Sequence, residues 1–136
     1  MAKLDTIEAK RKEFERLYNY FGPEDKLHIK CSFFLWEYYP EAVWFHPPNE
    51  GKREWFNQSR VKLMGVKPGV PDFIIMEPNY YHFGLVMEAK TSNGRLDPAQ
   101  KMWLDELRKK GFKAEVFRDF ETFTTIVQSY FECIPL

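Results

Sequence analysis

Residues 65–90 of the chain, GVKPGVPDFIIMEPNYYHFGLVMEAK, decide the fold and contain the candidate site. Two short apolar runs in this stretch read as neighbouring strands, because the Pro78-Asn79 pair between them is typical of a turn. Asp72 precedes the first run, and Glu88 and Lys90 follow the second. A hairpin that turns at Pro78-Asn79 would bring these three charges together, since its two arms have similar lengths.

Helices and further strands are predicted on both sides of this hairpin. Apolar residues at helical spacing, together with capping signals such as Asp97-Pro98 and Asp119, indicate the helices. The predicted helices are 4–20, 24–39, 56–64, 98–110 and 120–133, and the predicted strands are 42–45, 73–76, 83–87 and 113–117. The last strand follows a helix, so we expect it to run parallel to its neighbour. The pattern predicts one α/β domain around a mixed four-stranded sheet.

The composition indicates one soluble domain and names no partner. A chain of 136 residues suits a single domain, and 44% hydrophobic residues provide ample material for its core. Cys31 and Cys133 have no metal-type spacing and are interpreted as reduced, buried thiols. The N-terminus is charged, without a signal peptide, and no apolar run reaches transmembrane length. We therefore expect a cytoplasmic protein without a membrane partner.

Two basic segments stand out in a chain whose formal net charge is zero. The first contains Lys52, Arg53, Arg60, Lys62 and Lys67, and the second contains Arg108, Lys109, Lys110, Lys113 and Arg118. Two such segments can form the sides of a phosphate-binding groove, or they can be two solvated faces. Charge alone favours the solvated faces.

The charges at the strand ends also allow two interpretations. Glu88 and Lys90 are two residues apart and share one face of a strand, so they can form an ordinary ion pair with Asp72 as a turn cap. Alternatively, the two carboxylates hold Mg²⁺, which prefers oxygen ligands, and the backbone carbonyl of Ala89 adds another ligand. Phosphodiester hydrolysis needs such an ion for charge compensation. Mg²⁺ prefers these oxygen ligands to an imidazole, so we expect His46 to be structural or DNA-facing.

Several motifs in order closely resemble the VRR-NUC family, the virus-type replication-repair nucleases of the PD-(D/E)xK superfamily. They are HPPNEGKR, LMGVKPGVPDF, GLVMEAK and GRLDPAQKMWLDEL, within residues 24–130. Several of these segments fit the phage and bacterial stand-alone members. The resemblance implies a restriction-endonuclease-like core of order α-β-β-β-α-β, with a helical extension in residues 1–22 and an added C-terminal helix. It also implies a single nuclease domain over residues 1–136.

The resemblance assigns roles to the residues of the motifs. Asp72 and Glu88 look like ligands of Mg²⁺ or Mn²⁺, and Lys90 looks like the catalytic lysine. Gln100 matches a helix glutamine that reaches the site, although its position fits a capping box equally well. Trp103, close by, has the spacing of a core residue.

A further acid completes many sites of this superfamily, and two positions compete for that role. Glu24 is the best match on the helix before the first strand, and Glu50 lies in the Pro-Asn-Glu motif. Family members commonly place Gln four residues after the helix acid, whereas this chain has His28. That departure leaves the choice between the two acids open.

The family implies DNA as substrate, and we expect branched DNA such as flaps, splayed arms or Holliday junctions in repair. DNA contacts are expected from Asn49, Lys52, Arg53, Arg60, Lys62 and Lys67. A small chain is expected to work on such DNA as a homodimer, in a bacterial cell, with a phage or prophage as its source. The alternative is a catalytically weak or inactive DNA-binding module of the same fold.

Overall fold

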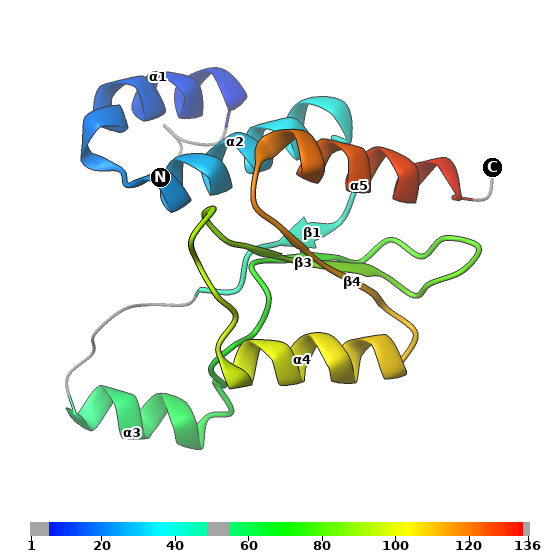
Figure 1. The fold of residues 1–136 in the computed structure, drawn as a ribbon. Coiled ribbons are helices and arrows are strands. Elements are labelled where there is room, and N and C mark those ends of the chain that lie inside the picture. Colours follow the sequence, from blue (N-terminus) through cyan, green and yellow to red (C-terminus); the bar gives the residue numbers. More distant parts are fainter. Residues whose placement is uncertain (1–5, 49–54, 135–136) are drawn as a thin grey trace.

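The computed structural model describes residues 6–48 and 55–134, and it shows a four-stranded sheet between two layers of helices (Figure 1). The helices are α1 (Ile7–Leu17), α2 (Pro23–Tyr38), α3 (Trp55–Leu63), α4 (Pro98–Lys109) and α5 (Phe120–Glu132), and a 3₁₀ turn, η2 (Tyr18–Tyr20), follows α1. The strands are β1 (Trp44–Phe45), β2 (Phe73–Ile75), β3 (Leu85–Ala89) and β4 (Lys113–Phe117). The predicted order of helices and strands is confirmed, with η2 as an addition.

The sheet has the order β1-β2-β3-β4 and is mixed, as predicted. β1, β2 and β3 pair antiparallel, whereas β4 runs parallel to β3 because α4 carries the chain back across the sheet. Side chains of β3 alternate between two cores: Leu85, Met87 and Ala89 pack against α2 and α5, and Val86 packs with Leu104 of α4. Covered on both faces, β3 is apolar apart from Glu88.

The second arm of the hairpin begins two residues later than predicted. β3 starts at Leu85 instead of Phe83, and it continues to Ala89. Gly84 is pressed against the Ile75 carbonyl and the Phe112 ring, and the Phe83 N–H donates to the Gly111 carbonyl, so the chain reaches the sheet only after Gly84. Because β3 continues to Ala89, Glu88 lies inside the strand rather than beyond its end.

The turn of the hairpin is fixed by Asn79, as its Pro-Asn sequence predicts. The Asn79 side-chain oxygen accepts from the N–H groups of Tyr81 and His82, while its amide group donates to the Tyr130 carbonyl at the end of α5. The Tyr130 hydroxyl in turn donates to the Glu77 carbonyl. The hairpin turn is thus tied to the last helix by two hydrogen bonds.

The helix signals agree with the expectations, and so does Cys31, whereas Cys133 is only partly buried rather than buried as predicted. Asp97 caps α4 in a full capping box with Pro98 in its first turn, and Asp119 caps α5. Cys31 is buried and unpaired, and burial raises the pKa of its thiol far above the ordinary value. In the described part of the chain, no helix combines the length and the apolar character needed to cross a membrane.

Candidate active site

The pairing of β2 with β3 places the two predicted acids side by side. Phe73 pairs with Met87, so Asp72, one residue earlier, lies level with Glu88, one residue later. An Asp72 carboxylate oxygen accepts a hydrogen bond from the Ala89 N–H at 2.8 Å. This bond anchors Asp72 to the end of β3 and holds its carboxylate at the mouth of the hairpin.

Glu88 is a carboxylate held inside the protein, with only 3% of its surface exposed. Its Oε1 accepts from the Gln100 side-chain amide at 2.7 Å and lies 3.9 Å from the Lys90 ammonium. Its Oε2 is buried and has no hydrogen-bond partner among the described residues. Burying an ionised group without full compensation is costly, so this second oxygen calls for a cation or a proton.

The pKa of the Glu88 carboxyl, next to Asp72, reflects this shortage of positive charge. Burial raises the pKa of the Glu88 carboxyl to about 8, and the negative charge of Asp72 acts in the same direction, while Lys90 lowers the pKa in part. Two ionised carboxylates only accept hydrogen bonds, but a protonated Glu88 can donate to Asp72. Without a metal ion, a proton on Glu88 relieves the repulsion.

Gln100 makes both of the contacts that the sequence left open. Its side-chain oxygen accepts from the Asp97 N–H at 3.0 Å and completes the capping box of α4. Its side-chain nitrogen donates to Glu88. One amide therefore joins the start of α4 to the buried acid, and the helix cap also sets the position of the active-site contact.

The loop before Asp72 is held against the same end of α4. Gly69 has a φ of 83° and lies so close to Ala99 that an added Cβ would stand 2.6 Å from the Ala99 carbonyl carbon. The Trp103 indole donates to the Pro68 carbonyl at 3.0 Å. Trp103 of α4 is half-buried against this loop and belongs to neither core, so the prediction that it is a core residue is wrong. Leu104, the next residue, fills the core instead.

The residues present fit a divalent cation. Asp72 and Glu88 offer hard oxygen donors, one of them buried and unsatisfied within the described structure. The N–H and C=O of one strand residue point to the same side, so the Ala89 carbonyl lies on the side of Asp72, to which its N–H donates. That orientation suits the predicted role of the Ala89 carbonyl as a third oxygen ligand.

The two candidates for a further acid have different positions. Glu24 lies in the first turn of α2 and lines a hollow with Thr91, Ser92 and Asn93, the loop that follows Lys90. Among the described residues, no group of three possible ligands within 4.8 Å includes Glu24. Glu50 lies outside the described residues. The assignment of a further acid stays a prediction.

The predicted DNA-binding residues fall into two groups. Asn49, Lys52 and Arg53 lie outside the described residues. Arg60, Lys62 and Lys67 are exposed on α3 and the loop that follows it. Figure 1 shows α3 beyond the end of α4 at which the chain enters that helix, the end that carries Gln100. Three basic residues thus lie on the side of the molecule that holds the acids.

The second basic segment is largely engaged with the chain itself. Arg108 donates to the Ala114 carbonyl, and Arg118 donates to the carbonyls of Thr91 and Gly94. Lys109 and Lys113 form ion pairs with Glu106 and Glu115. These contacts favour a structural role for the segment, and Arg118 in particular fixes the loop after Lys90.

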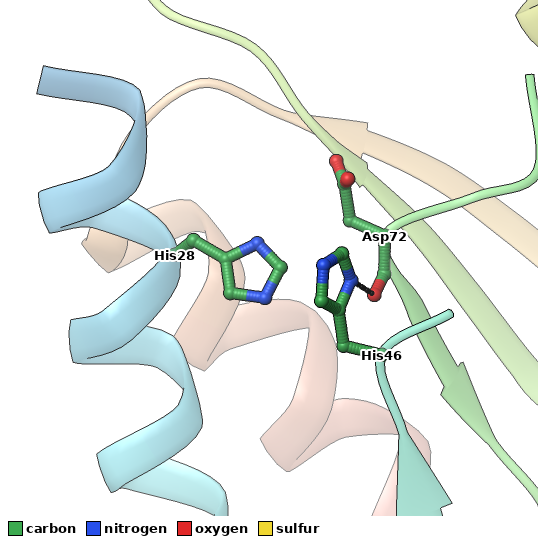
Figure 2. A group of neighbouring side chains, drawn as sticks. All are labelled: His28, His46 and Asp72. Carbon is green, nitrogen blue, oxygen red and sulfur yellow. Dashed lines mark hydrogen bonds between the residues drawn. The ribbon is translucent and has the colours of Figure 1, made fainter. Parts of the chain in front are cut away.

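A pair of histidines beside Asp72 is the feature that the sequence did not assign to the site. The rings of His28 and His46 have centroids 4.2 Å apart, and the His46 Nδ1–H donates to the Asp72 carbonyl at 2.7 Å (Figure 2). Burial lowers the pKa of His28, and the neighbouring His46 lowers it further. One signal was available in the sequence, namely His28 at the position where family members commonly have Gln. The contact of His28 with His46 could not be predicted, because the two residues belong to separate elements.

Comparison with known proteins identifies relatives of the chain. A family model described as the VRR-NUC domain matches residues 10–119. A segment of 48 residues, 35% of this chain, is 46% identical to "Fanconi-associated nuclease 1" of Ailuropoda melanoleuca, and it spans 5% of that protein's length. A solved structure titled "VRR_NUC domain protein" superposes with a TM-score of 0.70 at 24% identity, over 84% of this chain and 92% of that one. The similarity to this solved structure shows that the chain has the same fold.

The raised pKa of Glu88 predicts a pH-dependent stability in the absence of divalent ions. The folded protein holds a proton on Glu88 up to about pH 8, whereas the ordinary pKa is 4.5. The stabilising contribution is therefore complete below about pH 4.5 and is lost as the pH rises through 8, by at most about 1.4 kcal/mol per pH unit. Urea unfolding in EDTA between pH 5.5 and 9 should show this decline, and Glu88→Gln should flatten it. An equal slope in both proteins would contradict the prediction.

The two bonds of Gln100 can be separated by one substitution. Gln100→Glu keeps the acceptor for the Asp97 N–H but replaces the donor to Glu88 with a second acceptor. We expect a loss of about 1–3 kcal/mol of unfolding free energy at pH 9 in EDTA, and a much smaller loss at pH 5.5, where a proton shared between the introduced carboxyl and Glu88 can restore the bond. Gln100→Ala, which removes both bonds, serves as the comparison. Equal losses at both pH values in Gln100→Glu would show that the amide does not respond to Glu88.

Proposed function

The chain belongs to the VRR-NUC domain family, a family of nucleases, and we propose that it is a metal-dependent, structure-selective DNA endonuclease. The observation that carries the proposal is the buried Glu88 carboxylate, whose free oxygen faces a shortage of positive charge beside Asp72. An ion pair that merely stabilised the sheet would leave no such oxygen. Lys90 and Gln100 at the same acid complete a catalytic arrangement.

Asp72 and Glu88 would hold the ion, with the Ala89 carbonyl as a third ligand. Mg²⁺ or Mn²⁺ supplies positive charge to the phosphate oxygens and lowers the pKa of a bound water molecule. The chain contributes the rest. The Ala89 N–H keeps Asp72 in place, and Gln100 orients Glu88 through Oε1. The Lys90 ammonium, held by the acid at 3.9 Å, positions the attacking water and offsets the charge that develops at phosphorus.

DNA is proposed to approach the acids from the side of α3. Arg60 and Lys62 in the last turn of α3, and Lys67 after it, are exposed and can contact phosphates. At the opposite end of α4, Arg108 and Lys109 already pair with Asp105 and Glu106. This difference gives the molecule one face that suits the backbone of DNA. We also propose that the DNA is branched and that two copies of the protein act on it together.

The active-site assignment predicts a loss of cleavage without a loss of folding. With Mg²⁺ or Mn²⁺, the wild type should cut at least one of flaps, splayed arms and four-way junctions. Asp72→Asn and Lys90→Ala should each reduce that cleavage at least about 100-fold, because the first removes a ligand of the ion and the second removes positive charge that stabilises the transition state. Asp105→Asn, on the exposed face of α4, is the matched control and should cut normally.

The same substrate panel separates the two functions. Thermal melting confirms that each variant is folded, and the mass of the protein–DNA complex shows whether one or two copies bind. If the wild type leaves all three substrates intact with either metal, the endonuclease proposal fails. DNA binding that persists without cleavage would then favour the inactive binding module.

The DNA-facing side is tested by binding in EDTA, where no cleavage occurs. Arg60→Ala and Lys62→Ala should each weaken binding and lower the slope of log affinity against log salt by about 0.9 for duplex DNA, the value for one lost phosphate contact. Lys109→Ala should leave both the affinity and the slope unchanged. Fluorescence anisotropy over a range of salt concentrations gives both quantities. Equal effects of all three substitutions would contradict the proposed face.

A further inference from the structure

Three side chains from distant parts of the sequence converge on one point next to the acidic centre. His28 comes from α2, His46 follows β1, and Asp72 precedes β2. One nitrogen of each imidazole and one carboxylate oxygen of Asp72 all lie within 4.8 Å of one another. Figure 2 shows the two rings next to each other, with the Asp72 carboxylate near them. In the described part of the chain this is the group of three that can surround an ion.

The hydrogen bond of His46 prepares this ring to act as a ligand. A backbone carbonyl only accepts, so the Nδ1 that contacts the Asp72 carbonyl at 2.7 Å must carry the proton. In the neutral ring the other nitrogen, Nε2, then keeps its lone pair, and Figure 2 shows that nitrogen on the side of His28. Histidines that bind metals are commonly fixed in this way, with the second ring N–H donating to a carbonyl or a carboxylate.

His28 is held firmly in the corresponding position. Its ring stacks on Phe73 with centroids 4.4 Å apart and an angle of 28°, and it meets the His46 ring edge to face. The two histidines also line a hollow between α2 and β1, together with Ser32, Trp36 and other residues, so an ion can reach them from solvent. The cluster thus combines fixed donors with access.

The donor set differs in kind from that of the acidic pair. Two imidazoles and one carboxylate suit Zn²⁺ and its neighbours in the first transition row, whereas Mg²⁺ prefers oxygen alone. Ligand bonds of about 2.0–2.2 Å in a tetrahedron require donors about 3.4 Å apart. The present spread of up to 4.8 Å is therefore closed by side-chain movements of about 1–1.5 Å.

We propose that His28, His46 and Asp72 form a binding site for a divalent transition ion of the zinc class, next to the acidic centre. Water would complete the coordination. The Asp72 carboxylate is common to the two sites, so each of its oxygens can serve one ion, and occupation of one site affects the other. The site goes beyond the proposed nuclease function and does not depend on cleavage.

Cobalt binding tests the site, because Co²⁺ accepts zinc ligands and its visible absorption strengthens in tetrahedral coordination. The experiment uses the untagged full chain, titrated with CoCl₂ and then with ZnSO₄ as competitor. We expect one tightly bound Co²⁺ that Zn²⁺ displaces, without the charge-transfer band of a cysteine ligand. His28→Gln and His46→Gln should each weaken binding at least tenfold.

Two control variants assign the ion to its ligands. His82→Gln changes the third histidine of the chain and should bind Co²⁺ as the wild type does. Glu88→Gln changes the acidic centre, which shares Asp72 with the site, so it should keep the bound Co²⁺ and change the affinity by less than about tenfold. Unchanged binding in His28→Gln and His46→Gln would overturn the proposal. So would a loss confined to Glu88→Gln, which would place the ion in the acidic centre and leave the nuclease proposal intact.

A second measurement needs no variant and so does not depend on how the substitutions fold. In a proton NMR titration of the wild type with Zn²⁺, the ring signals of His28 and His46 should shift or broaden at one equivalent, while those of His82 stay in place. Ring signals that are unaffected at His28 and His46 would overturn the site. Cleavage activity enters neither test, so its absence has no bearing on the outcome.

Discussion

The carboxylate of Glu88, buried on the α4 face of β3, is the constraint on which the rest of this structure depends. A charge in that position must be satisfied from nearby, and the surrounding elements are arranged to do so. The register of β2 brings Asp72 level with it, the chain after β3 returns Lys90 toward it, and the first turn of α4 presents Gln100. Since one oxygen is left over among the described residues, the same arrangement that stabilises the fold leaves a place for a cation.

Contacts that depend on strand parity and local caps could be predicted from the sequence. The spacing of Glu88 and Lys90 fixes their common face, and the Pro-Asn turn sets Asp72 opposite them. The capping box of α4 is also local, because Asp97 and Gln100 are three residues apart. In each case the geometry of a single element, or of one hairpin, decides the result.

What the sequence missed lies between elements. Trp103 has core spacing, yet its ring faces the loop at Pro68, since only a narrow strip of α4 faces the sheet. The start of β3 depends on how Phe112 packs against Gly84, and the contact of His28 with His46 depends on where α2 crosses the end of β1. Helix and strand periodicity carries no information about such crossings.

The clamp between the hairpin turn and α5 has a consequence for how the protein forms. Asn79 and Glu77 are bound to Tyr130, which lies 51 and 53 residues later in the chain, so these bonds close long loops. Closing long loops is slow compared with forming helices. During synthesis, the two strands that carry the acids therefore wait for residue 130 to leave the ribosome before their turn is secured. A nascent chain stalled before that point would expose the apolar faces of β2 and β3, which makes it a substrate for chaperones.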